Sequence, residues 1–224
     1  MRNLRYVKCQ GRFPNTKLGK ELISISKKWM QLVIDYTDIA SVDNSYCEPP
    51  YWHNERANVS LLANAAAKKG VICLEDYLAS KRTVEDGRRN AQNYGRVDLK
   101  AYKFPKNKRL NFFIEAKQSW PTDGYKFSPD IPMKVAVKDV KRAAIDDPSL
   151  TGIACVFYTL RTKCDGSHVA GDVKKGCDAL IAKITNYDIL AISLPAKARS
   201  LCDEEDDGLC RFWPGVAMAL KKVG

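Results

Sequence analysis

Apolar residues recur at three- and four-residue steps over residues 16–40, which predicts an amphipathic helix. The stripe consists of Leu18, Leu22, Ile25, Trp29, Leu32, Val33, Tyr36 and Ile39. Asn15 or Thr16 is placed to cap its N-terminus. A second helix is predicted over residues 52–69, which are rich in Ala and Leu, and Gly70 is suited to end it.

The middle of the chain is less regular. Residues 71–78 favour a strand, and the polar residues 80–94 predict a loop. Two strand-like runs follow, GRVDLKAY and RLNFFIEAKQ, on either side of residues 103–108. After a segment rich in Pro and Gly, a helix is predicted over residues 133–147. Its apolar stripe would be Val135, Val137, Val140, Ala143, Ala144 and Ile145.

The last third of the chain alternates between apolar runs and a helical pattern. Residues 152–160 and 188–194 predict buried strands, residues 172–185 a helix, and residues 213–223 a strand or short helix. This order predicts an α/β fold with a mixed central β-sheet flanked by helices. We expect an N-terminal helical extension over residues 1–50 and a main domain over residues 51–224, together forming one compact unit.

Composition and charge narrow the class of protein. The 224 residues have ordinary globular composition, which excludes disordered and collagen-like chains. No apolar run approaches the roughly 20 residues of a membrane span, so no membrane partner is expected. The net charge is +11, and residues 81–142 alone carry sixteen Lys or Arg against seven Asp or Glu. This excess favours a polyanionic partner, nucleic acid first.

Cysteine usage predicts the redox environment. There are eight cysteines, and no two have the C-x-x-C spacing of a structural zinc site. Several, such as Cys73 and Cys155, stand inside apolar runs and are typical of small buried side chains. We expect free thiols and a cytoplasmic location.

The two strand-like runs predict a hairpin whose turn centres between Lys106 and Asn107. Paired residue numbers then sum to 213, which puts Asp98 opposite Glu115 and Arg96 opposite Lys117. One face would carry Val97, Leu99, Ala101, Phe112, Ile114 and Ala116, all apolar. The other face would carry Arg96, Asp98, Lys100, Tyr102, Asn111, Phe113, Glu115 and Lys117. Gln118 points to the face opposite Lys117 in a regular strand.

Two carboxylates directly opposite each other destabilise a hairpin, so a purely structural hairpin would avoid this pair. A divalent cation supplies a reason for it, because Mg²⁺ is commonly held by one or two carboxylates, waters and substrate phosphates. Lys117 lies two residues after Glu115 and projects on the same face. Two acids and a lysine beside a metal are suited to phosphodiester hydrolysis.

Asp98, followed after a hairpin by Glu115-Ala116-Lys117, resembles the PD-(D/E)XK nuclease superfamily. Many members carry a Glu on the helix before the core hairpin, and Glu55 occupies that place here. Val97 precedes Asp98 where the family motif has Pro. The resemblance covers roughly residues 51–195 and implies a restriction-endonuclease-like core with an extra N-terminal helix.

The resemblance also implies roles for individual residues. Asp98 and Glu115 would ligate Mg²⁺ or Mn²⁺, with the Ala116 carbonyl as a further oxygen ligand. Lys117 would orient or activate the attacking water and stabilise the transition state. Glu55 would contact the metal directly, through water, or at a second metal.

Basic side chains around the hairpin are candidates for contacts with the nucleic-acid backbone. They are Arg88 and Arg89 before the hairpin, Arg96 and Lys100 on its polar face, and Lys106, Lys108 and Arg109 at its turn. Trp120 and Tyr125, in the loop after the motif, are placed to stack on bases.

These observations predict a Mg²⁺-dependent deoxyribonuclease, with endonuclease activity as the first expectation. A non-catalytic nucleic-acid-binding or scaffold protein that retains the nuclease core is an alternative, and a nuclease acting on structured RNA is another. Double-strand cutting of the restriction type usually needs two sites, and therefore a homodimer or a partner protein. The resemblance implies a role in a bacterial or phage restriction or defence system.

Overall fold

The computed structural model describes residues 2–42, 46–82, 92–104, 110–121, 127–143, 150–164, 170–199, 202–204 and 210–224. The helices are α1 (Lys17–Ile39), α2 (Glu55–Ala67), α3 (Asp130–Arg142) and α4 (Ala170–Ala182). The strands of the main sheet are β1 (Leu4–Cys9), β4 (Ile72–Arg82), β5 (Gln92–Lys103), β6 (Leu110–Ser119), β7 (Thr151–Cys164), β8 (Ile189–Leu194), β9 (Cys202–Glu204) and β10 (Cys210–Val223). Two short strands, β2 (Ser41–Val42) and β3 (Tyr46–Cys47), pair separately.

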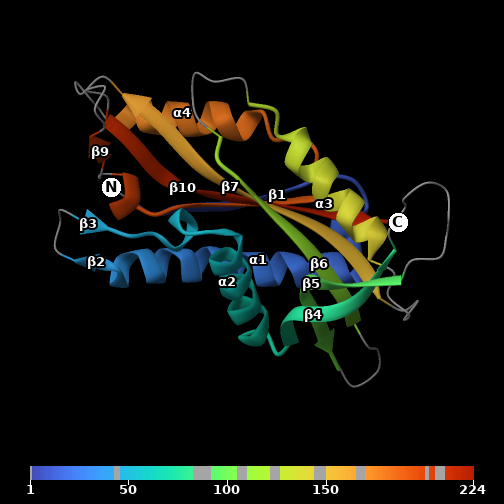
Figure 1. Ribbon diagram of the computed structural model, residues 1–224. Helices are drawn as coiled ribbons and strands as arrows, with labels where there is room; N and C mark the ends of the chain where they lie inside the picture. The colour runs from blue at the N-terminus through green and yellow to red at the C-terminus, as the bar shows by residue number, and fades with distance from the viewer. Residues whose placement is uncertain are drawn as a thin grey trace.

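The main sheet has the order β1-β8-β10-β7-β6-β5-β4, and β9 pairs with β10. Neighbouring strands are antiparallel except β6 and β7, which run parallel and are connected through α3. The sheet is therefore mixed, and the predicted α/β class is confirmed. Helices α1 and α2 cover one face, whereas α3 and α4 cover the other (Figure 1).

Each face of the sheet has its own hydrophobic cluster. On the α1 and α2 side, Trp29 is fully buried, and its ring lies 5.8 Å from that of Phe157. On the α3 and α4 side, Met133 and Leu180 are fully buried. Because helices pack on both faces, the central strands β7, β8 and β10 are buried on both sides, as continuous apolar runs predict.

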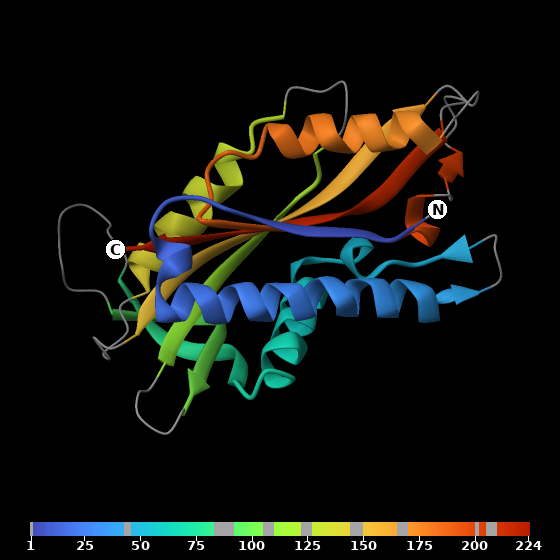
Figure 2. The same ribbon diagram turned by 180° about the vertical axis from the view of Figure 1, so that it is seen from behind.

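Helix α1 confirms the predicted N-terminal helix, and Thr16 caps it by accepting a hydrogen bond from the Gly19 amide at 3.0 Å. The preceding segment forms a strand that sequence analysis did not anticipate: β1 pairs with β8 along the edge of the sheet (Figure 2). The first forty residues are thus part of the common core.

The second helix begins at Glu55, three residues later than predicted. Asn54 caps it, and the three residues Pro50–Trp52 form a separate 3₁₀ turn. The helix ends at Ala67, and Gly70 follows with a φ of +73°, a conformation that Gly adopts readily.

One prediction in the middle of the chain was wrong. The part of residues 80–94 that the structure describes is not a loop, because β4 continues to Arg82, β5 begins at Gln92, and the two strands pair. The predicted third helix is confirmed, but it spans Asp130–Arg142 and so begins three residues early, because Pro132 fits in the first turn of a helix; Ala144 and Ile145 of the predicted stripe lie outside the described residues. Its buried residues are Met133, Ala136 and Val140, whereas Val135 is exposed.

The C-terminal predictions are largely confirmed. Strands β7 and β8 and helix α4 match the predicted segments within a few residues, except that β7 extends to Cys164. The last element is a strand, which lies centrally between β7 and β8. Its register shifts between Phe212 and Gly215, around Pro214, as expected for a residue that cannot donate a backbone hydrogen bond. In the described part of the chain, every helix is too short or too polar to cross a membrane.

The buried Trp29 tests whether α1 belongs to the core. We expect Trp29→Ala to lower the free energy of unfolding by about 3–5 kcal/mol, because it leaves a large cavity. Ile39→Ala, at an exposed position of the same helix, should change it by less than about 0.5 kcal/mol. Urea denaturation of both variants measures the difference, and equal midpoints would contradict a structural role for α1.

Candidate active site

The predicted hairpin register is confirmed where β5 and β6 pair. Five residue pairs, from Lys103↔Leu110 to Leu99↔Ile114, all sum to 213. The ladder ends there, so the predicted pairing of Asp98 with Glu115, and of Arg96 with Lys117, does not form. Instead, the Ala116 backbone amide donates a hydrogen bond of 2.6 Å to Oδ2 of Asp98. The Asp98 carboxylate thus satisfies an amide that a continued ladder would have paired.

The predicted division of the hairpin into an apolar and a polar face was wrong in part. Leu99 belongs to the cluster under α1 and α2, but Val97 belongs to the cluster under α3 and α4. Residues two apart share a face in a regular strand, so β5 changes its facing at Asp98. On the neighbouring strand, Asp76 has a φ of +50°, which is uncommon outside Gly.

The face expected to be polar is largely covered. Phe113 is buried under α3, and Glu115 is also buried. Lys100 is buried with its ammonium 4.0 Å from the centre of the Tyr77 ring and 5.3 Å from that of Tyr102. Phe113 is covered because α3 packs on this side of the sheet, and Lys100 because the tyrosine rings pack against it; no hairpin pattern reveals either contact.

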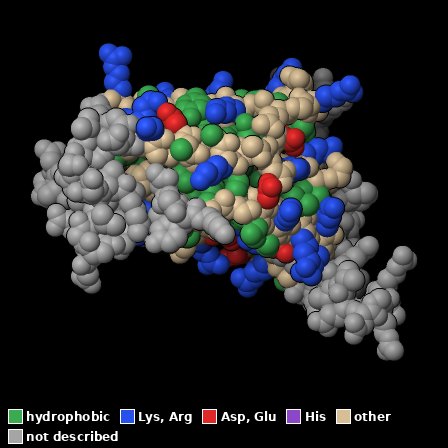
Figure 3. Space-filling model, turned by 90° about the horizontal axis from the view of Figure 1, so that it is seen from above, with side chains coloured by type: hydrophobic (Ala, Val, Ile, Leu, Met, Phe, Trp, Pro, Cys, Tyr) green, Lys and Arg blue, Asp and Glu red, His purple; other side chains and the backbone are tan. Residues whose placement is uncertain are grey.

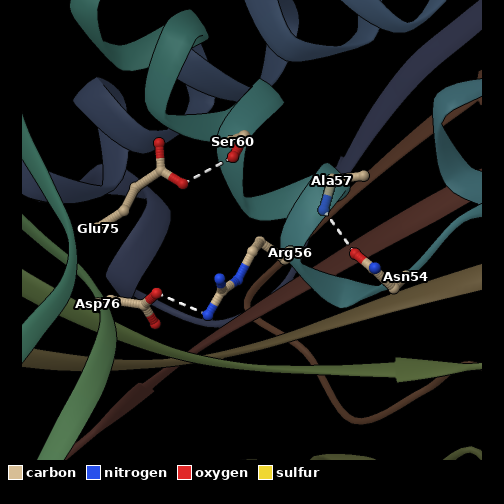
Figure 4. Close-up of polar contacts among 6 residues, drawn as sticks. All are labelled: Asn54, Arg56, Ala57, Ser60, Glu75 and Asp76. Carbon is tan, nitrogen blue, oxygen red and sulfur yellow. Dashed lines mark hydrogen bonds and ion pairs between the residues drawn. The ribbon is translucent and has the colours of Figure 1, made fainter.

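Helix α2 holds Glu55 in its first turn, and three polar contacts fix that turn (Figure 4). The Asn54 side chain accepts a hydrogen bond from the Ala57 amide at 3.0 Å. Arg56 forms an ion pair with Asp76 at 2.6 Å, and the Ser60 hydroxyl donates to Glu75 at 2.7 Å. The last two contacts attach α2 to β4 and so position Glu55 beside the end of the β5–β6 ladder.

Glu55 lies in an environment that disfavours its charge. Burial and the nearby Asp98 raise the pKa of its carboxyl. The Lys117 ammonium and a hydrogen bond from the backbone amide of Gln118 lower it by less. Glu55 and Asp98 also line a small hollow of about 90 Å³, together with Glu75 and Asp76. Glu75 and Asp76 are engaged by Ser60 and Arg56, so Glu55 and Asp98 are the two acids of this hollow that remain as candidate cation ligands.

Lys117 reaches the same region from β6. Its ammonium lies 3.1 Å from Oδ2 of Asp139 on α3 and donates to the Ala116 carbonyl at 2.8 Å. Burial by itself lowers the pKa of Lys117. The hydrogen bond to Asp139 and the charges of Glu55, Asp139 and Asp98 raise it, and together they outweigh burial, so the pKa lies above its ordinary value. Lys117 is therefore a cation at neutral pH.

Asp139 was missed by sequence analysis, because a helix acid twenty-two positions away gives no local signal that it meets Lys117. Gln118 was placed on the correct face, but its partners were not foreseen: its side chain donates to the Tyr51 carbonyl at 3.1 Å and to Oγ1 of Thr159 at 3.2 Å. Asn58 of α2 donates to Gln118 at 3.4 Å. Gln118 does point away from Lys117, and there it connects β6 to α2.

The predicted backbone-binding residues are only partly within the described chain. Arg96 is exposed on β5, whereas Lys100 is buried against the two tyrosines. The remaining candidates, Arg88, Arg89, Lys106, Lys108 and Arg109, lie outside the described residues. Tyr125 also lies outside them.

The oxygen donors at this site fit a hard divalent cation. Mg²⁺ needs one or two carboxylates, completed by waters and phosphate oxygens, and Asp98 and Glu55 supply two. The pKa of Glu55 is raised mainly by burial and to a lesser extent by the charge of Asp98, and a bound cation would offset both effects. Among the described residues, no three or more His, Cys, Asp or Glu side chains are gathered as a ready-made metal cage.

Comparisons with known proteins place the chain in no family: no family model, curated protein or solved structure matches it.

The raised pKa of Glu55 predicts how stability depends on pH. Below pH 4.5, its ordinary pKa, the carboxyl is largely neutral in both folded and unfolded chains. As the pH rises, the unfolded chain loses its proton first, so the folded state loses stability until its own pKa is passed. Glu55→Gln should therefore melt at a higher temperature than the wild type at pH 7, with the difference shrinking at pH 3.5.

Thermal unfolding at the two pH values measures this difference. Glu55→Ala is the companion variant, because it removes the charge and also the acceptor for the Gln118 amide. Its melting temperature at pH 7 should therefore rise less than that of Glu55→Gln. A constant difference between Glu55→Gln and wild type at both pH values would contradict the electrostatic account.

Proposed function

We propose that this protein is a nuclease of the PD-(D/E)XK type that hydrolyses DNA phosphodiester bonds with Mg²⁺ or Mn²⁺. The observation that carries the proposal is the convergence of Glu55, Asp98 and Lys117 at the end of the β5–β6 ladder. In this proposal the sheet with helices on both faces serves as a restriction-endonuclease-like core. Glu115, two residues before Lys117 on β6, completes the motif.

The proposed mechanism assigns each side chain a task. Asp98 and Glu55 would hold the cation, with Glu115 and the Ala116 carbonyl as further oxygen donors. When bound, the cation lowers the pKa of a water and offsets negative charge on the phosphate. Lys117, held protonated, would donate hydrogen bonds to the attacking water or a phosphate oxygen, where charge increases in the transition state. Its protonation argues against a role as general base.

Asp139 is a positioning residue in this proposal. It contacts Lys117 at 3.1 Å from α3, on the side away from α2. An ion pair at this distance restricts the ammonium to one region of the site while keeping it charged.

The charge distribution supports a polyanionic substrate. Exposed lysines dominate the outer surfaces of α3 and α4, among them Lys134, Lys138, Lys141 and Lys175. Figure 3 shows this face, where Lys and Arg side chains are widespread and acidic ones are few. Such a surface attracts nucleic acid without regard to sequence. Cys9, Cys73 and Cys155 carry free thiols, which supports the proposed cytoplasmic location.

Plasmid cleavage tests the activity and the site together. Supercoiled plasmid is incubated with the protein and Mg²⁺, Mn²⁺ or EDTA. We expect metal-dependent nicking or linearisation, with the rate reduced by about 10²–10³-fold in Lys117→Ala, because a cation at the transition state is lost.

Lys103→Ala is the matched control for this experiment. Lys103 is as exposed as Lys117, at 26% against 28%, and it also pairs with a helix acid, Glu21 of α1, at 2.7 Å. It should cleave like the wild type. Equal loss in the two variants, or full activity of Lys117→Ala, would contradict the assigned site.

Metal binding separates the nuclease from the scaffold alternative without relying on turnover. Isothermal titration with Mn²⁺ should detect binding to the wild type, weakened at least about tenfold in Asp98→Asn, because a ligand charge is lost. Asp178→Asn is the control, since Asp178 is an acid on α4 paired with Lys174 at 2.6 Å. Wild-type affinity in Asp98→Asn would remove Asp98 from the metal site.

A further inference from the structure

Three tryptophans that are far apart in the sequence form one cluster beside the candidate site. The rings of Trp52 and Trp213 lie 6.0 Å apart, and those of Trp120 and Trp213 lie 5.6 Å apart at an angle of 89°. The guanidinium of Arg161 lies 4.9 Å from the centre of the Trp213 ring. These residues come from the turn before α2, the end of β6, and strands β7 and β10.

The cluster lies beside the start of α2, the helix that carries Glu55. Trp120 follows Lys117 by three positions, so in an extended strand it projects to the opposite face, the α1 and α2 side, where Trp52 and Trp213 also pack. Trp52 precedes Glu55 by three positions. Tyr51 donates from its hydroxyl to the Trp213 carbonyl at 2.9 Å, and its own carbonyl accepts from Gln118. The cluster and the site therefore share one hydrogen-bonded framework.

Within the cluster, Trp120 is exposed to an extent that a core residue would not be. Its relative exposure is 43%, although Trp213 packs against it edge to face. Burial of a tryptophan is strongly favourable, so a rigidly supported and open indole beside a polar site is suited to receive a flat partner. The adjacent Arg161 adds positive charge, and Arg guanidinium planes also stack on bases.

We propose that Trp120, supported by Trp213 and Arg161, is a nucleobase-binding subsite that stacks an unpaired base of the bound strand. Base–aromatic stacking needs a base whose face is exposed, and such faces occur in single strands, overhangs and flaps but not inside a duplex. The subsite thus favours substrates with an unpaired stretch next to the scissile phosphate.

The proposed subsite deepens the proposed nuclease function and rests on it. Its test measures binding and does not require cleavage. Binding of a fluorescein-labelled single-stranded DNA 12-mer is measured by anisotropy in EDTA, which prevents turnover. The variants are Trp120→Ala, Trp120→Phe and Tyr6→Ala. Tyr6 is a control aromatic with 36% exposure on β1, an edge strand four places from β6 in the sheet.

We expect Trp120→Ala to bind at least about tenfold more weakly, whereas Trp120→Phe retains most of the affinity and Tyr6→Ala retains all of it. A set of oligonucleotides with one abasic position each completes the test. At one position the missing base should weaken binding by the wild type but not by Trp120→Ala, as expected when the two changes remove the same contact.

Equal affinity of Trp120→Ala and the wild type for the oligonucleotide, with both proteins folded by circular dichroism, would overturn the subsite. So would equal weakening by Tyr6→Ala. If Trp120 governs binding but Mg²⁺ and Mn²⁺ produce no cleavage, the subsite stands and the nuclease proposal fails. If cleavage depends on Lys117 and binding is indifferent to Trp120, the reverse holds.

Discussion

The hydrogen bond from the Ala116 amide to Asp98 is the contact on which the candidate site depends. In a continued ladder, the strand backbones would pair, and Asp98 and Glu115 would stand directly opposite each other at a cost in stability. Because a side chain takes the place of a strand partner, β5 and β6 separate beyond Leu99 and Ile114. Helix α2 approaches from one face and α3 from the other, so that Asp139 contacts Lys117 and the charge of Glu55 also acts on it.

Keeping Glu55 ionised at this site costs folding free energy. Glu55 is partly desolvated and lies near Asp98, and both effects raise its pKa. A structural role alone would not call for such an arrangement, since apolar or neutral side chains would be more stable there. A carboxyl with a raised pKa next to a protonated lysine is typical of functional sites, and this supports the proposed nuclease over a scaffold that has lost its chemistry.

One short segment serves both the proposed chemistry and the proposed base-stacking subsite. The 3₁₀ turn that contains Tyr51 and Trp52 leads directly into the helix that carries Glu55. Tyr51 is held between Gln118 and Trp213, so strands β6 and β10 both determine where this turn lies. A polar framework of this kind couples the two positions rigidly, because moving one partner would break hydrogen bonds to the other.

The sequence by itself determined the elements whose signal is local. The stripe of α1, the apolar runs of β7 and β8, and the register of the β5–β6 hairpin all follow from side-chain periodicity and pairing parity. The same reasoning singled out Asp98, Glu115 and Lys117 as candidates, and the resemblance to PD-(D/E)XK nucleases added Glu55. Tertiary structure alone decided that β1 joins the sheet, that Phe113 and Lys100 are covered, that Asp139 meets Lys117, and that Trp52 and Trp213 gather around Trp120. These contacts join residues far apart in the chain, and they arise from strand pairing and from helix packing on both faces of the sheet, which no local pattern encodes.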